Sequence, residues 1–191
     1  MALTTMDAVP ALIVIDLQQG ILAAPTAHPA KNIVHNAAEL AAAFRGHGLP
    51  VVLVTVTGGA RGRTDANPNH ARPANFSLPP NWADPAPGLD PQPTDHRVAK
   101  QRWGAFHDTD LHTYLSECQV TQVVLAGIAT SGGVESTARA AHEHGYHVVL
   151  ATDAMTDSDA EAHNNSVDRV FPRLGETTTT GEIIAMLDKT R

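Results

Sequence analysis

The sequence predicts an α/β fold in which a mostly parallel sheet carries helices on both faces. Four short, unbroken apolar runs are rich in β-branched residues, which is typical of strands buried on both faces of a parallel sheet. Stretches with apolar residues at helical spacing lie between and after these runs. Such alternation of strands and helices favours an α/β architecture, in which ligands bind at the carboxyl ends of the strands.

The predicted strands follow from the apolar runs. They are expected at residues 11–15, 51–56, 123–126 and 148–151. Residues 97–100 begin like a further short strand that leads into an aromatic, glycine-containing loop.

The predicted helices are marked by their spacing and by their end signals. Residues 33–44 show an apolar repeat close to 3.6, and two glycines follow it. Residues 134–144 carry apolar side chains on one face and stop at Gly145. Residues 158–161 (Ser-Asp-Ala-Glu) fit a capping box that opens a helix, and residues 182–187 form a last short helix.

The composition is that of a soluble globular protein. The chain has 191 residues, 42% of them hydrophobic, so it can bury a sizeable core. A net charge of −7 without any basic run argues against nucleic acid or an anionic membrane as the main partner. Neither a signal-peptide pattern nor an apolar run of the roughly 20 residues of a membrane helix is present. Cys118 is the single cysteine, which excludes an internal disulfide. We therefore expect a cytoplasmic protein.

One segment differs from the rest of the chain. Eight of the 13 prolines fall between Pro68 and Pro93, and proline disfavours regular structure. The sequence therefore predicts a single domain over residues 1–191 with an irregular, proline-rich excursion at about 58–95. Loops this long inside a domain are usually functional, so a lid or an interface arm is expected.

Asp16 follows five apolar residues and is expected at the carboxyl end of the first buried strand. A charge in such a place is costly without a partner. Two interpretations stay open on the pattern alone. The carboxylate caps the next turn, or it is a catalytic acid or base with a shifted pKa.

A basic and aromatic segment offers a partner for this carboxylate. Lys100, Arg102 and Trp103 could line a pocket for an anionic, planar substrate, with Lys100 as the natural partner of Asp16. The alternative is a solvated basic turn beside an anchoring tryptophan.

The glycine-rich segment 127–137 lies between a predicted strand and a predicted helix. Backbone amides in such a turn can form an anion or oxyanion site. The segment has neither a P-loop ending nor the Rossmann spacing nor a nucleophile elbow. Thr130 and Ser131 are therefore expected to cap the helix.

Three of these segments together resemble the isochorismatase-like (cysteine hydrolase) family. They are Val-Ile-Asp-Leu-Gln at 14–18, Lys-Gln-Arg-Trp-Gly-Ala-Phe at 100–106 and Gly-Ile-Ala-Thr-Ser-Gly-Gly-Val at 127–134. They occur in the family's order and spacing, and the resemblance covers nearly the whole chain, from Ala11 to about Leu187. It implies a three-layer α/β/α sandwich, Rossmann-like, around the mostly parallel sheet.

The resemblance also implies the residues of the site. Asp16, Lys100 and the residue at position 133, here Gly133, would form the catalytic trio. The amides of Ala129 and Gly133 would form an anion site, and the Ile128–Ala129 bond would be cis, as it is in many relatives. The implied substrate-binding residues are Gln18, Trp103, Phe106 and Ala129.

The sequence departs from the family's pattern at the nucleophile. Amide-cleaving members have a cysteine at the position of Gly133, which has no side chain and cannot form a thioester. Cys118 lies before the third strand and is expected to be a structural thiol. Isochorismatases proper cleave a vinyl ether without a cysteine; their aspartate is held to protonate the vinyl carbon before water adds.

No metal and no cofactor are expected. Nicotinamidase-like relatives have an Asp-x-His zinc site after the second strand, but residues 55–59 here read Thr-Val-Thr-Gly-Gly. The 11 histidines otherwise scatter, and His107 and His112 are expected at the surface.

Three functions remain open. The first is hydrolysis of a small organic acid without a cysteine nucleophile, best an isochorismate-type vinyl ether, with Asp16 as acid/base. The second is an amide or ester hydrolase in which Asp16 activates water. The third is a non-catalytic homologue that keeps the pocket. The expected partners are a small-molecule substrate and further copies of the chain, as a homodimer or homotetramer, with no nucleic acid and no membrane.

Overall fold

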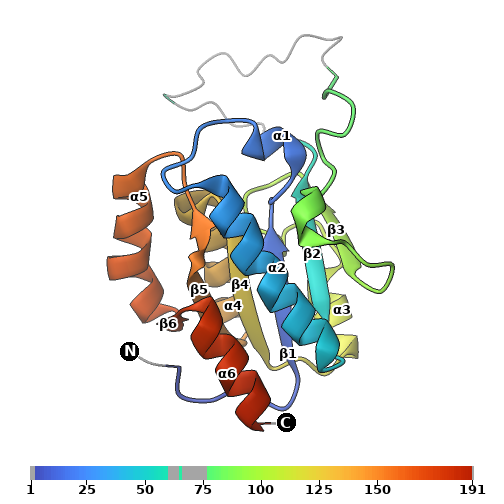
Figure 1. The fold of residues 1–191 in the computed structure, drawn as a ribbon, viewed down its shortest axis with the longest axis vertical. Coiled ribbons are helices and arrows are strands. Elements are labelled where there is room, and N and C mark those ends of the chain that lie inside the picture. The colour runs from blue at the N-terminus through green and yellow to red at the C-terminus, as the bar shows by residue number, and fades with distance from the viewer. Residues whose placement is uncertain (1–2, 60–64, 66–76, 191) are drawn as a thin grey trace.

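The fold is a six-stranded, entirely parallel sheet between two layers of helices (Figure 1). It is seen in a computed structural model that describes residues 3–59, 65 and 77–190. The strands lie in the order β3-β2-β1-β4-β5-β6. Their bounds are β1 Pro10–Ile15, β2 Val51–Val56, β3 His96–Lys100, β4 Gln122–Ile128, β5 His147–Thr156 and β6 Glu176–Thr178.

Helices cover both faces of this sheet, as predicted. Helices α2 (Ala30–Gly46) and α6 (Thr180–Thr190) pack on one face, and α3 (Leu111–Glu117) and α4 (Glu135–Glu143) pack on the other (Figure 1). The remaining helices are α1 (Gln19–Leu22), near the carboxyl ends of the central strands, and α5 (Ala160–Asn165). The prediction of a three-layer α/β/α sandwich is therefore confirmed.

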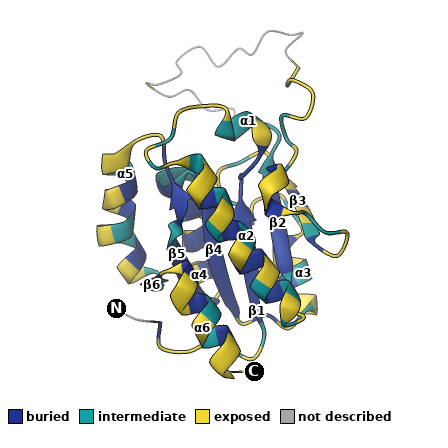
Figure 2. Cartoon of the chain, viewed as in Figure 1, coloured by how far each residue is buried: buried dark blue, intermediate teal, exposed yellow. Residues whose placement is uncertain are grey.

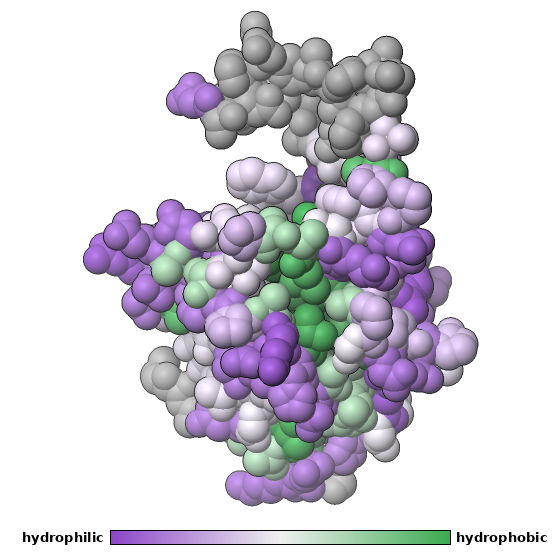
Figure 3. Space-filling view, turned by 45° about the horizontal axis from the view of Figure 1, so that its top comes forward, coloured by the Kyte–Doolittle hydropathy of each residue, from purple (hydrophilic) through white to green (hydrophobic). Residues whose placement is uncertain are grey.

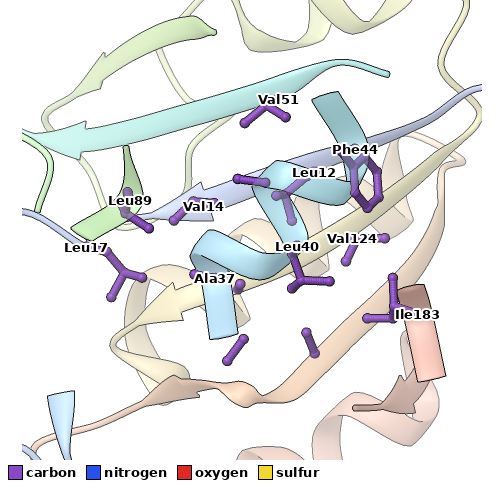
Figure 4. Close-up of a cluster of buried hydrophobic side chains, with 14 of the residues drawn as sticks. Leu12, Val14, Leu17, Ala37, Leu40, Phe44, Val51, Leu89, Val124 and Ile183 are labelled. Atoms are coloured by element: carbon purple, nitrogen blue, oxygen red, sulfur yellow. The ribbon is translucent and has the colours of Figure 1, made fainter. Parts of the chain in front are cut away.

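The core lies in two layers because successive side chains of a strand point to opposite faces. In β1, Leu12 and Val14 pack against α2, where they meet Leu40 and Phe44 (Figure 4). Ala11, Ile13 and Ile15 pack toward α3 and α4 on the other side. All six residues of β1 are buried, so this strand is central to both layers (Figure 2). This burial explains the unbroken apolar run from which the strand is predicted.

Helix α3 and strand β6, like the short helix α1, have no counterpart in the prediction. Helix α3 buries Leu111 and Leu115 alone, which is too short a repeat to mark a helix. Strand β6 is a three-residue edge strand of Glu-Thr-Thr and has no apolar run. The predicted capping box is also wrong in its detail. The N-cap of α5 is Asp159, whose side chain accepts hydrogen bonds from two amides of the first turn, whereas the Ser158 amide donates to Asp157.

The proline-rich excursion is described in part. Residues 60–64 and 66–76, on which much of the predicted lid or arm falls, lie outside the described residues. The returning part is tied to the segment after β1: the Ala86 amide donates to the Leu17 carbonyl, and the Gly20 amide donates to the Trp82 carbonyl. The rim of the sheet next to Asp16 is therefore built from two segments that are distant in the chain.

The face of the molecule in Figure 3 is mostly hydrophilic. On the face in Figure 3, a narrow central band of hydrophobic residues runs between broad hydrophilic areas. Across the described ranges, no helix has the length and apolar character that crossing a membrane requires.

Candidate active site

The carboxyl ends of four neighbouring strands meet at one edge of the sheet, in the order β3, β2, β1 and β4. Asp16 directly follows β1, Lys100 ends β3, and Ala129 directly follows β4. A cavity of about 400 Å³ opens there, lined among others by Asp16, Lys100, Arg102, Trp103, Ala129 and Gly133. This is the place at which α/β sheets bind ligands.

Asp16 and Lys100 form a buried ion pair. Lys100 Nζ donates to Asp16 Oδ2 at 2.6 Å and to the Arg102 carbonyl at 3.0 Å. The residues are 5% and 2% exposed, so water screens this pair little. Asp16 has a φ of 51°, a conformation that Asp and Asn tolerate better than other side chains. Its Oδ1 is buried and has no hydrogen-bond partner within 3.5 Å among the described residues, although the Val56 amide lies near enough to favour the carboxylate.

Burial raises the pKa of Asp16 to about 6, and the nearby Lys100 ammonium opposes this shift. Burial removes water from the charged carboxylate, and this loss of hydration has a larger effect on the pKa than the attraction to the ammonium. A carboxyl group with this pKa can hold or release a proton near neutral pH, as a general acid or base requires.

Gly133 lies directly against this carboxyl group. A Cβ added at position 133 would stand 3.2 Å from Asp16 Oδ2 and 3.1 Å from Ile15 Cγ2. Both distances are tight for a carbon atom, so a side chain here would press on the ion pair. The floor of the cavity at this position consists of backbone.

The loop from Ala129 to Val134 is held by its own backbone hydrogen bonds and by the buried side chains of Asp157 and His163. The Ile128–Ala129 bond is cis, as the resemblance implies. The Ala129 carbonyl accepts bonds from the Gly132 and Val134 amides. The loop winds as a single wide turn of π-type helix over Thr130–Val134, directly before α4.

Thr130 and Ser131 do not cap a helix, so that prediction is wrong. The amide and the hydroxyl of Ser131 both donate to Asp157 Oδ2, at 2.8 Å each. Thr130 Oγ1 lies 2.8 Å from Nδ1 of His163, whose pKa is lowered by burial. Asp157 is itself buried, but hydrogen bonds from Ser131 and Ser158 keep its pKa below the usual range.

Sequence reasoning missed Asp157 and His163. Strand β5 runs on to Thr156, beyond the apolar run that ends at Ala151. Had the predicted strand extended to Thr156, Asp157 would have followed its end directly, as Asp16 follows β1. His163 carries no local signal, because it is brought to Thr130 by the packing of α5.

Two predicted substrate-binding residues lie outside the described lining of the cavity. Gln18 is fully buried, and its side chain bonds to backbone: Oε1 accepts from the Val56 amide at 2.7 Å, and Nε2 donates to the Val56 and Trp82 carbonyls at 3.1 and 3.2 Å. Phe106 packs against Tyr146 and His144 on the α3 and α4 side of the sheet. The structure thus gives both residues a structural role. The Gln18 side chain ties the backbone of Val56 to that of Trp82, and Phe106 fills part of an apolar cluster.

We expect the Gln18→Ala substitution to lower the free energy of unfolding by about 2 kcal/mol, because partly buried backbone groups of Val56 lose their hydrogen bonds to the Gln18 side chain. Urea denaturation measures the loss. The neighbouring Gln19 is exposed and provides the matched control, Gln19→Ala. A loss below 1 kcal/mol for Gln18→Ala would show that the hydrogen bonds from the Gln18 side chain contribute little to stability.

The remaining candidates lie away from the cavity. Cys118 is half-buried at the end of α3 and is absent from the described lining of the cavity. His107 is exposed and lies 3.2 Å from Asp108. Within the part of the chain that the structure describes, no three His, Cys, Asp or Glu side chains are grouped closely enough to share a metal ion.

The fold and the site define a three-layer α/β protein with a buried Asp–Lys pair at the carboxyl edge of a parallel sheet. The comparisons with known proteins agree. Residues 10–182 match the Isochorismatase domain family. The chain belongs to the isochorismatase family of hydrolases.

Several relatives and solved structures match most of the chain. The isochorismatase family protein YecD of Escherichia coli O157:H7 is 42% identical over 93% of this chain and 95% of its own length. A structure of an isochorismatase family protein from Burkholderia thailandensis superimposes with a TM-score of 0.88 at 38% identity, covering 96% of this chain and 98% of that one. The streptothricin hydrolase of Streptomyces noursei is 32% identical over 85% of this chain and 55% of its own length.

Proposed function

We propose that the protein hydrolyses a small organic acid without a cysteine nucleophile, by isochorismate-type vinyl ether hydrolysis with Asp16 as the acid/base. The observation that carries the proposal is a buried carboxyl group with a pKa of about 6 next to a position without a side chain, Gly133. Such a site offers a proton but has no nucleophilic atom at position 133. A vinyl ether needs that combination, whereas attack on an amide normally needs a nucleophile.

The chemistry would proceed in three steps. Protonated Asp16 gives its proton to the terminal carbon of the enol ether, which leaves an oxocarbenium ion and the Asp16 carboxylate. Water adds to the cationic carbon and returns a proton to the carboxylate, so that the acid is restored. The resulting hemiketal breaks its carbon–oxygen bond and releases a keto acid and the ring alcohol.

The other residues of the cavity support this route. Lys100 holds the Asp16 carboxyl group in place and stabilises its anion once the proton has left. The amides of Ala129 and Gly133, at the cavity floor, would bind an anionic group of the substrate. Trp103 would supply a wall for an unsaturated ring.

A second enzyme function is an amide or ester hydrolase in which Asp16 activates water. The similarity to streptothricin hydrolase supports this alternative, because the name of that protein gives streptothricin, not isochorismate, as its substrate. A third possibility is a homologue that binds a ligand in the cavity and does not turn it over.

The test is hydrolysis of isochorismate by the purified protein in excess EDTA, with a panel of small amides and esters in parallel. Release of pyruvate from isochorismate supports the proposal. Cleavage of amides or esters alone would favour the second function. Tight binding without any turnover would favour the third.

We further propose that the protein is a cytoplasmic homodimer or homotetramer. A single, half-buried thiol at Cys118 fits a reducing compartment. Light scattering on the purified chain measures the number of copies, and a monomer at micromolar concentration would contradict the proposal.

A further inference from the structure

We propose that Arg102 binds a carboxylate of the substrate, so that the site selects organic anions over their neutral amides. This inference rests on the proposed function, since it names the residue that recognises the organic acid. It concerns binding specificity and assigns no proton transfer to Arg102.

The charges in the cavity point to Arg102. The ammonium of Lys100 is already matched, because it lies 2.6 Å from Asp16 Oδ2 and also donates to a carbonyl. Arg102 lines the same cavity with a side chain that is 38% exposed. Its nearest carboxylate, Asp108 Oδ2, lies 3.8 Å from Nη2, which is too long for a hydrogen bond. Arg102 is therefore a cavity cation whose ion pair with Asp108 is long and exposed to water.

The guanidinium suits a carboxylate in shape as well as in charge. Its planar fork of N–H donors can bind both oxygens of a carboxylate at once. The Asp108 side chain is 72% exposed, so water already solvates it and a substrate can displace it at little cost. Trp103 follows Arg102 and is 67% exposed, an unusual exposure for a large apolar side chain and one that a planar substrate would cover.

Arg102 lies in the same cavity as the ion pair. Its carbonyl oxygen lies 3.0 Å from Lys100 Nζ, which contacts Asp16. Asp16 and Gly133 also line this cavity, so a small molecule whose carboxylate is bound by the guanidinium can lie beside both. A cavity of about 400 Å³ is of the size that holds such a ligand.

The experiment compares benzoate with benzamide, two ligands of the same shape that differ in charge, by calorimetric titration of the wild-type protein. We expect benzoate to bind about 10- to 100-fold more tightly, which is the range for a charge-assisted pair. Arg102→Gln should remove this preference. Arg102→Lys should keep part of it, because a lysine retains the charge but loses the fork. None of these substitutions alters the carbonyl that Lys100 contacts.

Asp108→Asn is the matched control, because asparagine also tolerates the left-handed backbone of residue 108, where φ is 56°. It should keep the preference for benzoate. In turnover of isochorismate, Arg102→Gln should raise KM at least about 10-fold with kcat changed less than about threefold, as expected for lost substrate binding.

The outcomes separate this inference from the proposed function. Equal affinities of the wild-type protein for the two ligands, including no measurable binding of either, would overturn the role of Arg102. So would a preference that survives in Arg102→Gln. If the preference depends on Arg102 but isochorismate is not hydrolysed, the carboxylate site stands and the proposed reaction fails.

Discussion

Asp16→Asn is expected to lower kcat of the proposed hydrolysis about 1000-fold, because an amide cannot supply the proton that the vinyl carbon needs. The carboxyl group is the acid of the proposed reaction, and its pKa of about 6 keeps part of it protonated near neutral pH. Asparagine has nearly the same shape and tolerates the φ of 51° at this position. The measurement is the rate of pyruvate release from isochorismate at saturating substrate.

The fold of this variant should persist. Its free energy of unfolding is expected to fall by about 3 kcal/mol, because the buried Lys100 ammonium loses its counter-charge. Circular dichroism and urea denaturation check that the protein is still folded. Asp90→Asn is the matched control, since Asp90 is exposed and also has a left-handed backbone, with φ of 46°. More than a tenth of wild-type kcat in Asp16→Asn would exclude Asp16 as the essential acid.

Lys100→Met is expected to move the pH dependence of the reaction to higher pH. In the wild-type protein, Asp16 must be protonated to act as an acid, so kcat/KM should fall as pH rises above about 6. The Lys100 ammonium lowers the pKa of Asp16, and its removal lets burial raise that pKa further. The descending limb of the kcat/KM profile should therefore shift upward by about one pH unit or more.

Lys100→Met is also expected to lower the free energy of unfolding by an amount that depends on pH. The folded-state pKa of Asp16 is above its value of 3.8 in the unfolded chain, so the folded state binds more protons between the two values. Stability from this group is therefore present at low pH and is lost as pH rises through the folded pKa. Lys100→Met raises the folded pKa and extends this window, so it should cost more stability at pH 8 than at pH 5.

Arg97→Met is the control for this second prediction, because Arg97 is an exposed cation on the same strand. It should change neither the kcat/KM profile nor the pH dependence of unfolding. A Lys100→Met profile that keeps its limb near pH 6 would show that Lys100 does not control the titration of Asp16.

The family and the placement of the central residues could be predicted because their signals are local. Unbroken apolar runs mark strands that are buried on both faces, and Asp16 stands out because it follows such a run. Lys100 and Gly133 were predicted to share a site with Asp16 from the resemblance, and the structure places all three at one cavity. Parallel strands end at the same edge of a sheet, so residues after neighbouring strands necessarily come together.

Roles that depend on side-chain partners were not predictable. Gln18 and Phe106 belong to motifs near the site, yet one clamps backbone and the other fills an apolar cluster. Asp157 and His163 hold the loop at Ser131 and Thr130 without any motif. These four outcomes depend on which groups lie within a few ångströms after folding, and the spacing of residues along the chain does not encode that.

The residue pattern alone was sufficient for the layered α/β architecture, for the family and for the edge of the sheet at which chemistry is expected. Periodicity and turn residues determine the architecture, because burial and chain direction act on each segment locally. The family follows from the resemblance of three motif segments, at 14–18, 100–106 and 127–134. The assembled molecule added the balance of forces on Asp16, in which burial outweighs the attraction of Lys100, and the weakly paired cation at Arg102. The pKa of Asp16 depends on how far folding removes its carboxylate from water, and the ion pairing of Arg102 depends on its distance from the nearest carboxylates. Both are set only when the strands come together in the folded protein.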